Sequence, residues 1–282
     1  MVGVSFCINF CCLLRCAIDF DNNCKFLGHT EYSIIPDFIL DNYLYIFEGC
    51  FSLENGLCLT FKTYLSTLFF CLFTWAVTLI LGFSVAYFLA FYVNSTPLQV
   101  ALFLICTIPF WTSNVIRMVS WIPLLGRNGL VNDFMISLGV IEQPIEWLLY
   151  SSFSVILALV HLYTLFMIVP IFNSMLRIDE EIIEAAYDAG ASQLQIIKNI
   201  VIPLCKPGII IGSIFVVTVV MGDFLTIGIM GGQQLASVGK IINTEMNYLQ
   251  LPGAAANSVI LLVITILVVF IMTKVIDIRK EL

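Results

Sequence analysis

Residues 179–203 read DEEIIEAAYDAGASQLQIIKNIVIP and form the longest charged, helix-patterned interval in a very apolar chain. Acidic residues open this stretch, and apolar residues at helical spacing follow them. Gly190 is the residue type best suited to a left-handed helix end, so we expect the first helix to finish there. Ser192 can cap a second helix, which we expect to end at Pro203. Its apolar stripe consists of Leu194, Ile197 and Val201. The stretch therefore predicts two short amphipathic helices joined at a glycine.

The composition around this stretch is that of an integral membrane protein. The chain has 282 residues, of which 60% are hydrophobic and 11% are charged, and its mean hydropathy is +1.03. A soluble core cannot absorb so much apolar surface. The formal net charge is -7, and the 12 lysines and arginines are scattered along the chain. Nucleic acid is therefore excluded as a partner, because phosphate binding needs clustered cations.

Several long stretches carry no charge, or a single one, and can each cross a bilayer. They are 64–93, 98–116, 147–176, 207–230 and 246–273. Residues 1–20 are also apolar but contain Arg15 and Asp19, so they are a weaker candidate for a first span. We expect an all-α, polytopic protein with about six transmembrane helices, since unpaired backbone is not tolerated in lipid. We further expect an N-terminal segment with an external connector at 1–59 and a transmembrane domain at 60–282.

The basic residues suggest how the chain is oriented. About half of them lie around the 179–203 stretch or in the C-terminal tail, and the positive-inside rule places both regions in the cytoplasm. These residues are Arg177, Lys198, Lys206, Lys274, Arg279 and Lys280. We therefore predict that the 179–203 stretch is cytoplasmic.

Cysteines crowd the N-terminus at Cys7, Cys11, Cys12 and Cys16. Their spacing could bring thiolates together around a metal ion. Cysteine is also a small apolar residue that fits a membrane helix, and we favour that interpretation. We predict no metal site.

Within the 179–203 stretch, Glu184-Ala185-Ala186 is followed after three residues by Gly190 and after nine more by Ile200-Val201-Ile202-Pro203. This pattern resembles the signature EAA-x3-G-x9-I-x-L-P of the membrane subunits of binding-protein-dependent ABC importers. Ile202 replaces the leucine of the signature, which is a volume-conserving change.

The resemblance implies that residues 179–203 are the coupling loop, which seats in a groove of a cytoplasmic ATPase subunit. The residues it assigns to ATPase coupling are Glu184, Ala185, Ala186, Gly190, Ile200 and Pro203. The physical chemistry agrees, because two alanines keep one helix face thin, a glutamate can meet a basic partner residue, and a glycine sets the angle between the helices. The alternative is an ordinary amphipathic surface hairpin.

Two further stretches resemble spermidine/putrescine-type permeases. The first runs from Ile108-Pro109-Phe110-Trp111-Thr112-Ser113 through Ile116-Arg117 and Trp121 to Arg127-Asn128-Gly129-Leu130-Val131-Asn132. The second is Met221-Gly222-Asp223-Phe224 followed by Gly231-Gly232. The resemblance implies a polyamine permease in the cell membrane. Permeases for ferric iron, thiamine or phosphonate share much of this layout and remain the alternatives.

Asp223 is the strongest substrate-path candidate, because an acid inside a predicted span is expensive unless it faces water, a partner or a ligand. It could offset the charge of a protonated amine, or it could hold structure at a helix break, for example by pairing with Arg117. Trp111, Trp121 and Tyr163 could make cation-π contacts with an amine, although anchoring at the membrane interface is the more usual role of such aromatics. We expect His161 to be a packing residue rather than a proton relay.

The sequence contains no phosphate-binding loop of the form G-x-x-x-x-G-K-[ST] and no catalytic motif such as G-x-S-x-G or H-E-x-x-H. We therefore expect a non-catalytic subunit that binds no cofactor, with ATP and Mg²⁺ used by a partner. The expected partners are a pair of ABC ATPase subunits, a second permease subunit, an extracytoplasmic substrate-binding protein and membrane lipid. A stand-alone ion-coupled carrier, in which Asp223 and His161 relay protons, and a membrane enzyme are the alternatives.

Overall fold

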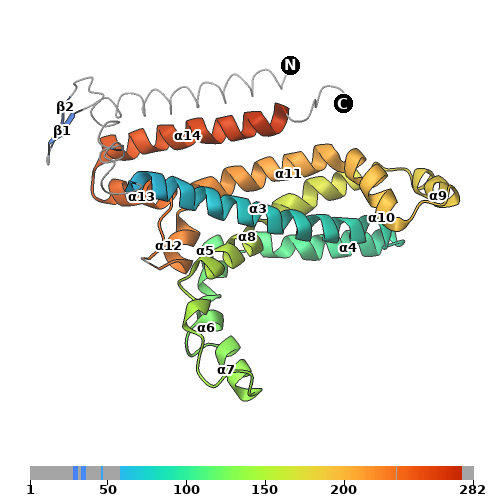
Figure 1. Ribbon diagram of the computed structural model, residues 1–282, viewed down its shortest axis with the longest axis horizontal. Coiled ribbons are helices and arrows are strands. Elements are labelled where there is room, and N and C mark those ends of the chain that lie inside the picture. Colours follow the sequence, from blue (N-terminus) through green and yellow to red (C-terminus); the bar gives the residue numbers. More distant parts are fainter. Residues whose placement is uncertain (1–27, 31–32, 36–45, 47–57, 233, 275–282) are drawn as a thin grey trace. The chain divides into compact units, whose positions relative to one another are not determined.

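The computed structural model describes residues 28–30, 33–35, 46, 58–232 and 234–274 (Figure 1). Two short antiparallel strands, β1 (Gly28–Thr30) and β2 (Ser33–Ile35), pair in the register Gly28 to Ile35. Helices make up the other described elements. In chain order they are α3 (Leu59–Phe91), α4 (Thr96–Thr107), η1 (Ile108–Trp111), α5 (Asn114–Val119), α6 (Ile122–Leu125), α7 (Leu130–Ser137), η2 (Glu146–Leu148), α8 (Ser152–Met175), α9 (Glu180–Asp188), α10 (Gln193–Ile196), the π-helical turn η3 (Ile197–Val201), α11 (Ile202–Gly222), α12 (Leu225–Met230), α13 (Val238–Asn247) and α14 (Leu251–Lys274).

Among these described residues, 4 helical segments are long and apolar enough to cross a membrane, and up to 5 if one bent pair counts as a span. The 4 segments are Thr60–Phe91, Glu146–Met175, Gln193–Gly222 and Leu251–Lys274. The all-α, polytopic prediction is confirmed. The remaining predicted span, at 1–20, and the cysteines within it lie outside the described residues. The domain boundary at residue 59 stays a prediction.

The predicted span at 98–116 is bent rather than straight. Helix α4 and the turn η1 are followed by Thr112 and Ser113 in extended conformations, with ψ of 152° and 134°. The pair Thr96–Trp111 and Asn114–Ser137 consequently meets at 90°. Two extended residues cannot continue the helical hydrogen bonds, and hydropathy does not reveal the bend because apolar residues stand on both sides of it.

The predicted span at 207–230 is placed wrongly at both ends. The helical segment begins at Gln193 and ends at Gly222, so Pro203 does not stop the second coupling helix. A π-helical turn precedes α11, and Pro203 falls in the first turn of α11, where a missing N–H is tolerated. At the other end Asp223 has an extended backbone, with φ -75° and ψ 110°, so the helix ends there and α12 begins as a separate helix.

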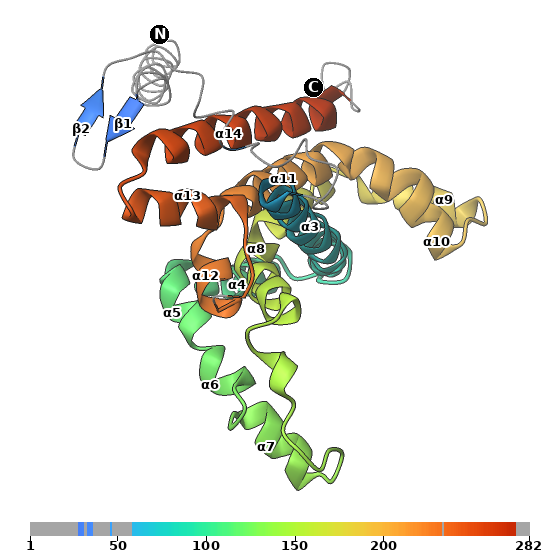
Figure 2. The ribbon, with the colours of Figure 1, turned by 60° about the vertical axis from the view of Figure 1, so that its left-hand side comes forward.

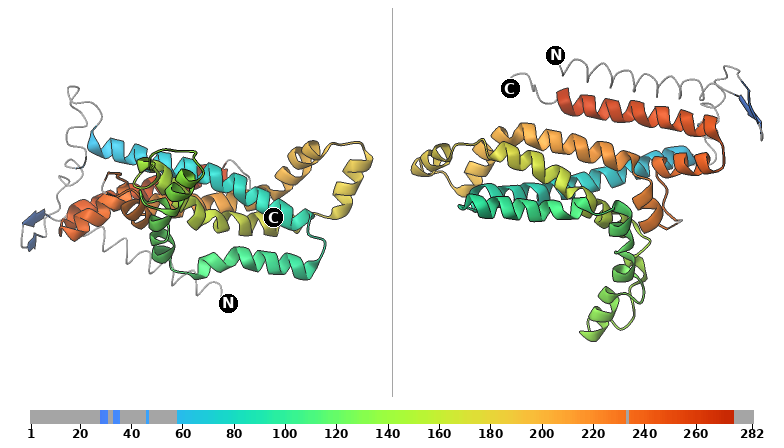
Figure 3. Two further views of the ribbon diagram at one scale, coloured as in Figure 1. Left: turned by 90° about the horizontal axis from the view of Figure 1, so that it is seen from below. Right: turned by 180° about the vertical axis from the view of Figure 1, so that it is seen from behind.

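The chain divides into two compact units, of which one comprises residues 68–235 and 267–282. Its core lies where α8 packs along α11 (Figures 1 and 3). Gly208 and Gly212 allow this close packing, because a Cβ at Gly208 would lie 2.3 Å from the Oγ of Ser174 and one at Gly212 would lie 2.8 Å from the Sδ of Met167. Small residues four positions apart are typical of closely packed membrane helices.

The same unit contains α4 and the part of α3 from residue 68 onward, and Figure 3 shows α4 turning back along α3. Gly82 of α3 meets Met167, since a Cβ there would lie 2.8 Å from the Cγ of that side chain. The Trp75 indole donates a hydrogen bond of 2.9 Å to the Oγ of Ser213, which joins α3 to α11. Three helices of this unit therefore share one packed region.

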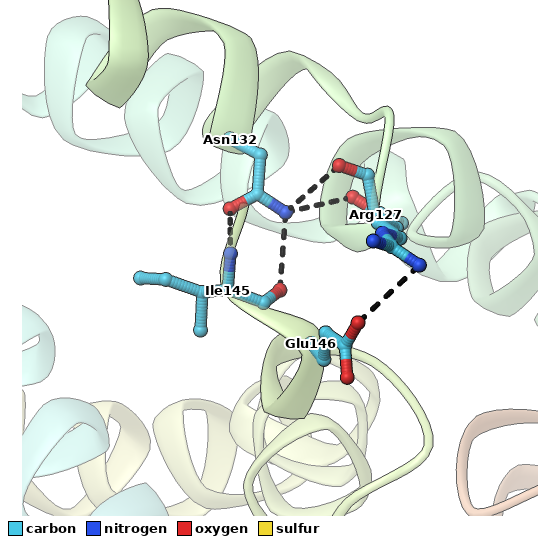
Figure 4. Close-up of polar contacts among 5 residues, drawn as sticks. Arg127, Asn132, Ile145 and Glu146 are labelled. Atoms are coloured by element: carbon cyan, nitrogen blue, oxygen red, sulfur yellow. Dashed lines mark hydrogen bonds and ion pairs between the residues drawn. The ribbon is translucent and has the colours of Figure 1, made fainter. Parts of the chain in front are cut away.

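The segment from α5 to α8 runs through α6 and α7 (Figure 2) and is organised by Asn132, whose side chain is fully buried. Its Nδ2 donates to the carbonyls of Gly126, Arg127 and Ile145 at 3.0 to 3.3 Å, and its Oδ1 accepts from the Ile145 N–H at 2.8 Å (Figure 4). The nearby ion pair between Arg127 and Glu146 is 3.3 Å long, but both side chains are about 70% exposed. The buried amide, rather than this solvated pair, fixes the segment.

The other unit comprises residues 1–67 and 236–266. In it, Asn257 donates through Nδ2 to both carboxylate oxygens of Glu245 at 3.1 Å. Burial raises the pKa of Glu245, and the hydrogen bond from Asn257 opposes that shift. The Thr67 hydroxyl accepts a hydrogen bond from the Val238 N–H at 3.0 Å. These polar contacts hold α13 against α3 and α14.

Candidate functional site

The predicted coupling loop forms two helices at one end of the 68–235 unit (Figure 1). Helix α9 begins with Glu180 and Glu181 in its first turn, where negative charge complements the helix dipole. No residue of α9 is buried. The helix therefore stands out from the bundle, as the sequence pattern predicts.

Gly190 ends α9 as predicted. Its φ is +82°, and its N–H donates to the Tyr187 carbonyl at 2.9 Å while the Ala191 N–H donates to the Ala186 carbonyl at 3.0 Å. These two bonds form a Schellman motif, in which a left-handed residue allows the last helical carbonyls to find donors. A Cβ at Gly190 would meet nothing within 4 Å, so the glycine is required by the backbone angle alone.

The second helix departs from the predicted apolar stripe. The Ser192 N–H donates a hydrogen bond of 2.8 Å to the Oε1 of Gln195, as expected for a helix start. Val201 is fully buried, but Leu194 is 78% exposed and its place inside is taken by Ile196. The π-helical turn follows α10 directly, and the two buried residues, Ile196 and Val201, are five positions apart, which matches its wider spacing. The exposed Leu194 was not predicted as a candidate contact.

The structure also places the individual residues assigned to coupling. Glu184, Ala185 and Gly190 are exposed on α9 and its end, whereas Ala186 is half-buried. Ile200 is half-buried in η3, and Pro203 is exposed at the start of α11. Large apolar side chains are exposed nearby at Ile182, Tyr187, Leu194, Ile202 and Leu204. These side chains stand among exposed carboxylates on the same loop, and exposed apolar groups rimmed by polar ones are typical of protein contact sites.

Asp223, the leading path candidate, lies at the break between α11 and α12 rather than inside a helix. Its carboxylate accepts three hydrogen bonds: from the Tyr163 hydroxyl at 2.6 Å, the Thr226 N–H at 2.9 Å and the Thr226 hydroxyl at 2.5 Å. Three donors therefore converge on this one side chain. The predicted alternative pairing with Arg117 is not formed among the described residues.

A cavity of about 360 Å³ opens beside this carboxylate. Its lining comes from α5, α8, α11 and α12 and is apolar or hydroxyl-bearing apart from one amide and one acid. The lining residues are Asn114, Met118, Tyr163, Thr218, Val219, Gly222, Asp223, Phe224, Leu225 and Thr226. A mostly apolar cavity with a few convergent polar groups is the usual form of a small-molecule site. We call this cavity the Asp223 pocket.

The other path candidates do not line the Asp223 pocket. Arg117 is only 9% exposed, and its guanidinium donates to Asn114, which does line the pocket. Trp111 is 83% exposed on η1. Trp121 donates through its indole N–H to Nδ1 of His161 at 3.1 Å, so that histidine has a packing partner, as expected.

Sequence reasoning named Tyr163 only as an aromatic candidate and missed Asn114 and Thr226. Tyr163 is 60 positions from Asp223, and nothing in the sequence brings them together. Thr226 could have been found, since an acid just before a helix commonly accepts a hydrogen bond from the N–H three residues later. Among the described residues, no group of three or more His, Cys, Asp or Glu side chains could hold a metal ion.

Comparison with known proteins identifies the family. Residues 33–281 match the family described as "Binding-protein-dependent transport system inner membrane component". The spermidine/putrescine transport system permease protein PotB of Escherichia coli (strain K12) is 33% identical over 244 residues, which cover 85% of this chain and 84% of that protein. PotB of Haemophilus influenzae is 32% identical over 199 residues, covering 69% and 68%.

A solved structure has the same fold. One chain of a bacterial alginate ABC transporter, crystallised in complex with an alginate-bound periplasmic protein, superposes with a TM-score of 0.68 at 15% identity and covers 86% of this chain and 88% of its own. The chain therefore belongs to the family of inner membrane components of binding-protein-dependent transport systems.

Proposed function

We propose that this permease subunit of an ABC importer carries polyamines into the cell. The observation that supports the cargo is the Asp223 pocket, in which a single carboxylate is the only charged group among ten lining residues. An ammonium group is attracted to a carboxylate in a partly desolvated cavity, and the apolar walls suit an alkyl chain. The two relatives described above are named for spermidine and putrescine, which are such molecules.

Energy enters, in this proposal, through the coupling loop at 179–203. ATPase subunits dock on its exposed apolar surface, with Glu184 meeting a basic residue and Ala185 and Ala186 permitting close approach. Gly190 holds the helix angle, while Ile200 and Pro203 carry movement into α11. Helix α11 ends at Gly222, beside the Asp223 pocket. Movement of the loop therefore has a continuous helical segment, Gln193–Gly222, along which to reach the pocket.

The remaining parts of the transporter are supplied by partners. ATP and Mg²⁺ are bound by a pair of ATPase subunits, and this chain makes no bond-changing contribution. A second permease subunit completes the path, and an extracytoplasmic binding protein delivers the cargo. Within this chain, Asp223 contacts the cargo, Tyr163 donates a hydrogen bond to its carboxylate, Arg117 positions Asn114, and Trp111 and Trp121 lie at the edges of the path.

Reconstitution tests this function directly. Proteoliposomes that contain this chain, its second permease, the ATPase subunits and the binding protein should accumulate labelled spermidine or putrescine only when ATP is supplied. Uptake by this chain alone, driven by an ion gradient, would instead identify a stand-alone carrier. Uptake of ferric iron, thiamine or phosphonate in place of amines would agree with the proposed ATP-driven mechanism but would contradict the proposed polyamine cargo.

Replacing Asp223 by asparagine should lower polyamine uptake by roughly tenfold to a hundredfold, the factor expected from losing a charge-assisted interaction of about 1.5–3 kcal/mol. Asparagine keeps the size of the side chain and removes its charge. The measurement is the initial rate of labelled amine uptake, normalised to the amount of chain in the membrane.

Tyr163→Phe is the matched control, because it removes one hydrogen bond to the same carboxylate and leaves the charge in place. We expect Tyr163→Phe to keep most of the wild-type uptake, in contrast to Asp223→Asn. Equal uptake in wild type and Asp223→Asn, at equal expression, would contradict a role for this carboxylate in cargo binding.

A further inference from the structure

A second cavity, of about 340 Å³, lies beside the coupling loop, between the end of α3 and helix α9. Figure 1 shows α9 and α10 at the end of the unit where α3 finishes. The cavity is bordered by Tyr87 and Tyr92 at the end of α3 and by Glu180, Glu184 and Tyr187 on α9. Gln193 closes one side, because its Nε2 donates to the Tyr92 hydroxyl at 2.6 Å. This cavity plays no part in the path described above.

Its two walls have complementary chemistry. On α9, the cavity-lining residues fall at positions 180, 183, 184 and 187, so one helix face presents two carboxylates and a phenol beside the apolar side chain of Ile183. At the end of α3, the aromatic rings of Tyr87 and of Tyr92, which directly follows the helix, lie with their centroids 6.0 Å apart. Aromatic ring faces and carboxylates both attract cations.

No basic residue lines this cavity. Among the described residues, neither Glu180 nor Glu184 forms an ion pair, and like charges one helical turn apart repel each other. The cavity therefore holds negative charge that no side chain in its lining neutralises. A bound cation would remove that repulsion and lie against the aromatic wall at the same time.

We propose that this cavity binds an alkyl ammonium cation, separate from the Asp223 pocket. The aromatic wall favours an organic cation over a hydrated metal ion, because a methylene chain can lie against the rings while ammonium groups reach the carboxylates. The choice of a diamine as ligand rests on the proposed function, since cargo released inside would reach this end of the chain.

Binding here has a consequence for coupling. Glu184 and Tyr187 belong to the coupling loop, whereas Tyr87 belongs to α3 and Tyr92 directly follows it. A cation held between them ties α9 to α3 and occupies the carboxylate that would otherwise meet a basic residue of the ATPase. Accumulated amine should therefore slow ATPase coupling in a concentration-dependent manner.

The test measures equilibrium binding of labelled putrescine to the purified full chain in lipid nanodiscs. The Asp223→Asn variant is the background, so that the proposed transport site does not contribute. We expect this variant to bind one putrescine, and Glu180→Gln added to it should weaken that binding at least tenfold. Glu181→Gln is the control, since Glu181 lies on the same helix but does not line the cavity, and it should leave binding within twofold.

The outcomes separate the sources of the cation. If the Asp223→Asn background binds no putrescine, or if Glu181→Gln weakens binding as much as Glu180→Gln, the site is overturned. If Glu180→Gln changes only the affinity for the ATPase subunit, the cavity receives a basic side chain of that partner and the proposal fails. If putrescine binding still depends on Glu180 but the reconstituted transporter takes up no amines, the cation site in this cavity is supported and the proposed polyamine cargo is contradicted.

Discussion

Replacing Gly208 by valine is expected to prevent the chain from reaching its folded state in the membrane. A Cβ at this position would lie 2.3 Å from the Oγ of Ser174 and 2.4 Å from the carbonyl oxygen of Pro170. The carbonyl belongs to the backbone of α8, so relief requires the two helices to separate along their packed region. Overpacking of this kind costs at least about 2 kcal/mol, and separating the helices would also open the Asp223 pocket, whose walls they share.

Thermal unfolding and the monodisperse yield of the purified chain measure this effect. Gly228→Val is the matched control, because a Cβ there would meet nothing within 4 Å. The yield and unfolding temperature of Gly212→Ala should lie between those of Gly208→Val and Gly228→Val, since the closest contact of a Cβ at Gly212 is the flexible side chain of Met167. Equal yields and unfolding temperatures for Gly208→Val and Gly228→Val would show that the α8–α11 packing is looser than the structure indicates.

The spans were predictable because hydropathy alone decides which segments can enter lipid. The predicted stretches at 64–93 and 147–176 agree with the helical segments Thr60–Phe91 and Glu146–Met175 to within a few residues. Their boundaries were set wrongly where backbone geometry overrode composition. Pro203 was expected to stop a helix, and it instead occupies the first turn of α11 after a π-helical turn.

The candidate site was predictable only in its local part. Gly190 was identified from residue type, and its φ of +82° confirms the left-handed helix end. Asp223 was singled out for its charge in an apolar region, but its partner Tyr163 is 60 positions away and meets it only through the packing of α8 on α11. Trp111 and Trp121 were chosen by residue type, which cannot show whether a ring faces a cavity. The 340 Å³ cavity likewise depends on the return of α9 to α3.

Replacing Gly190 by valine should weaken assembly with the ATPase subunits about tenfold while the rest of the chain still folds. A β-branched residue in the left-handed region costs about 1–2 kcal/mol, and the strain is relieved if the Gly190 and Ala191 N–H groups release the carbonyls of Tyr187 and Ala186. The end of α9 then unwinds and its angle to α10 is lost. A loss of about 1.4 kcal/mol in docking lowers ATPase affinity tenfold, which co-purification of the two subunits would detect.

Gly139→Val is the control that separates coupling from general strain. Gly139 also has a positive φ, of +71°, and a Cβ there would likewise meet nothing within 4 Å, but it lies between α7 and η2, away from the coupling loop. Both variants should lose similar stability, because the backbone strain is the same. Gly139→Val should nevertheless retain the ATPase subunit, and Gly190→Asn should recover it in part because asparagine tolerates the left-handed region. If Gly139→Val loses the ATPase as completely as Gly190→Val, residues 179–203 are an ordinary surface hairpin and the energy of ATP enters this chain elsewhere.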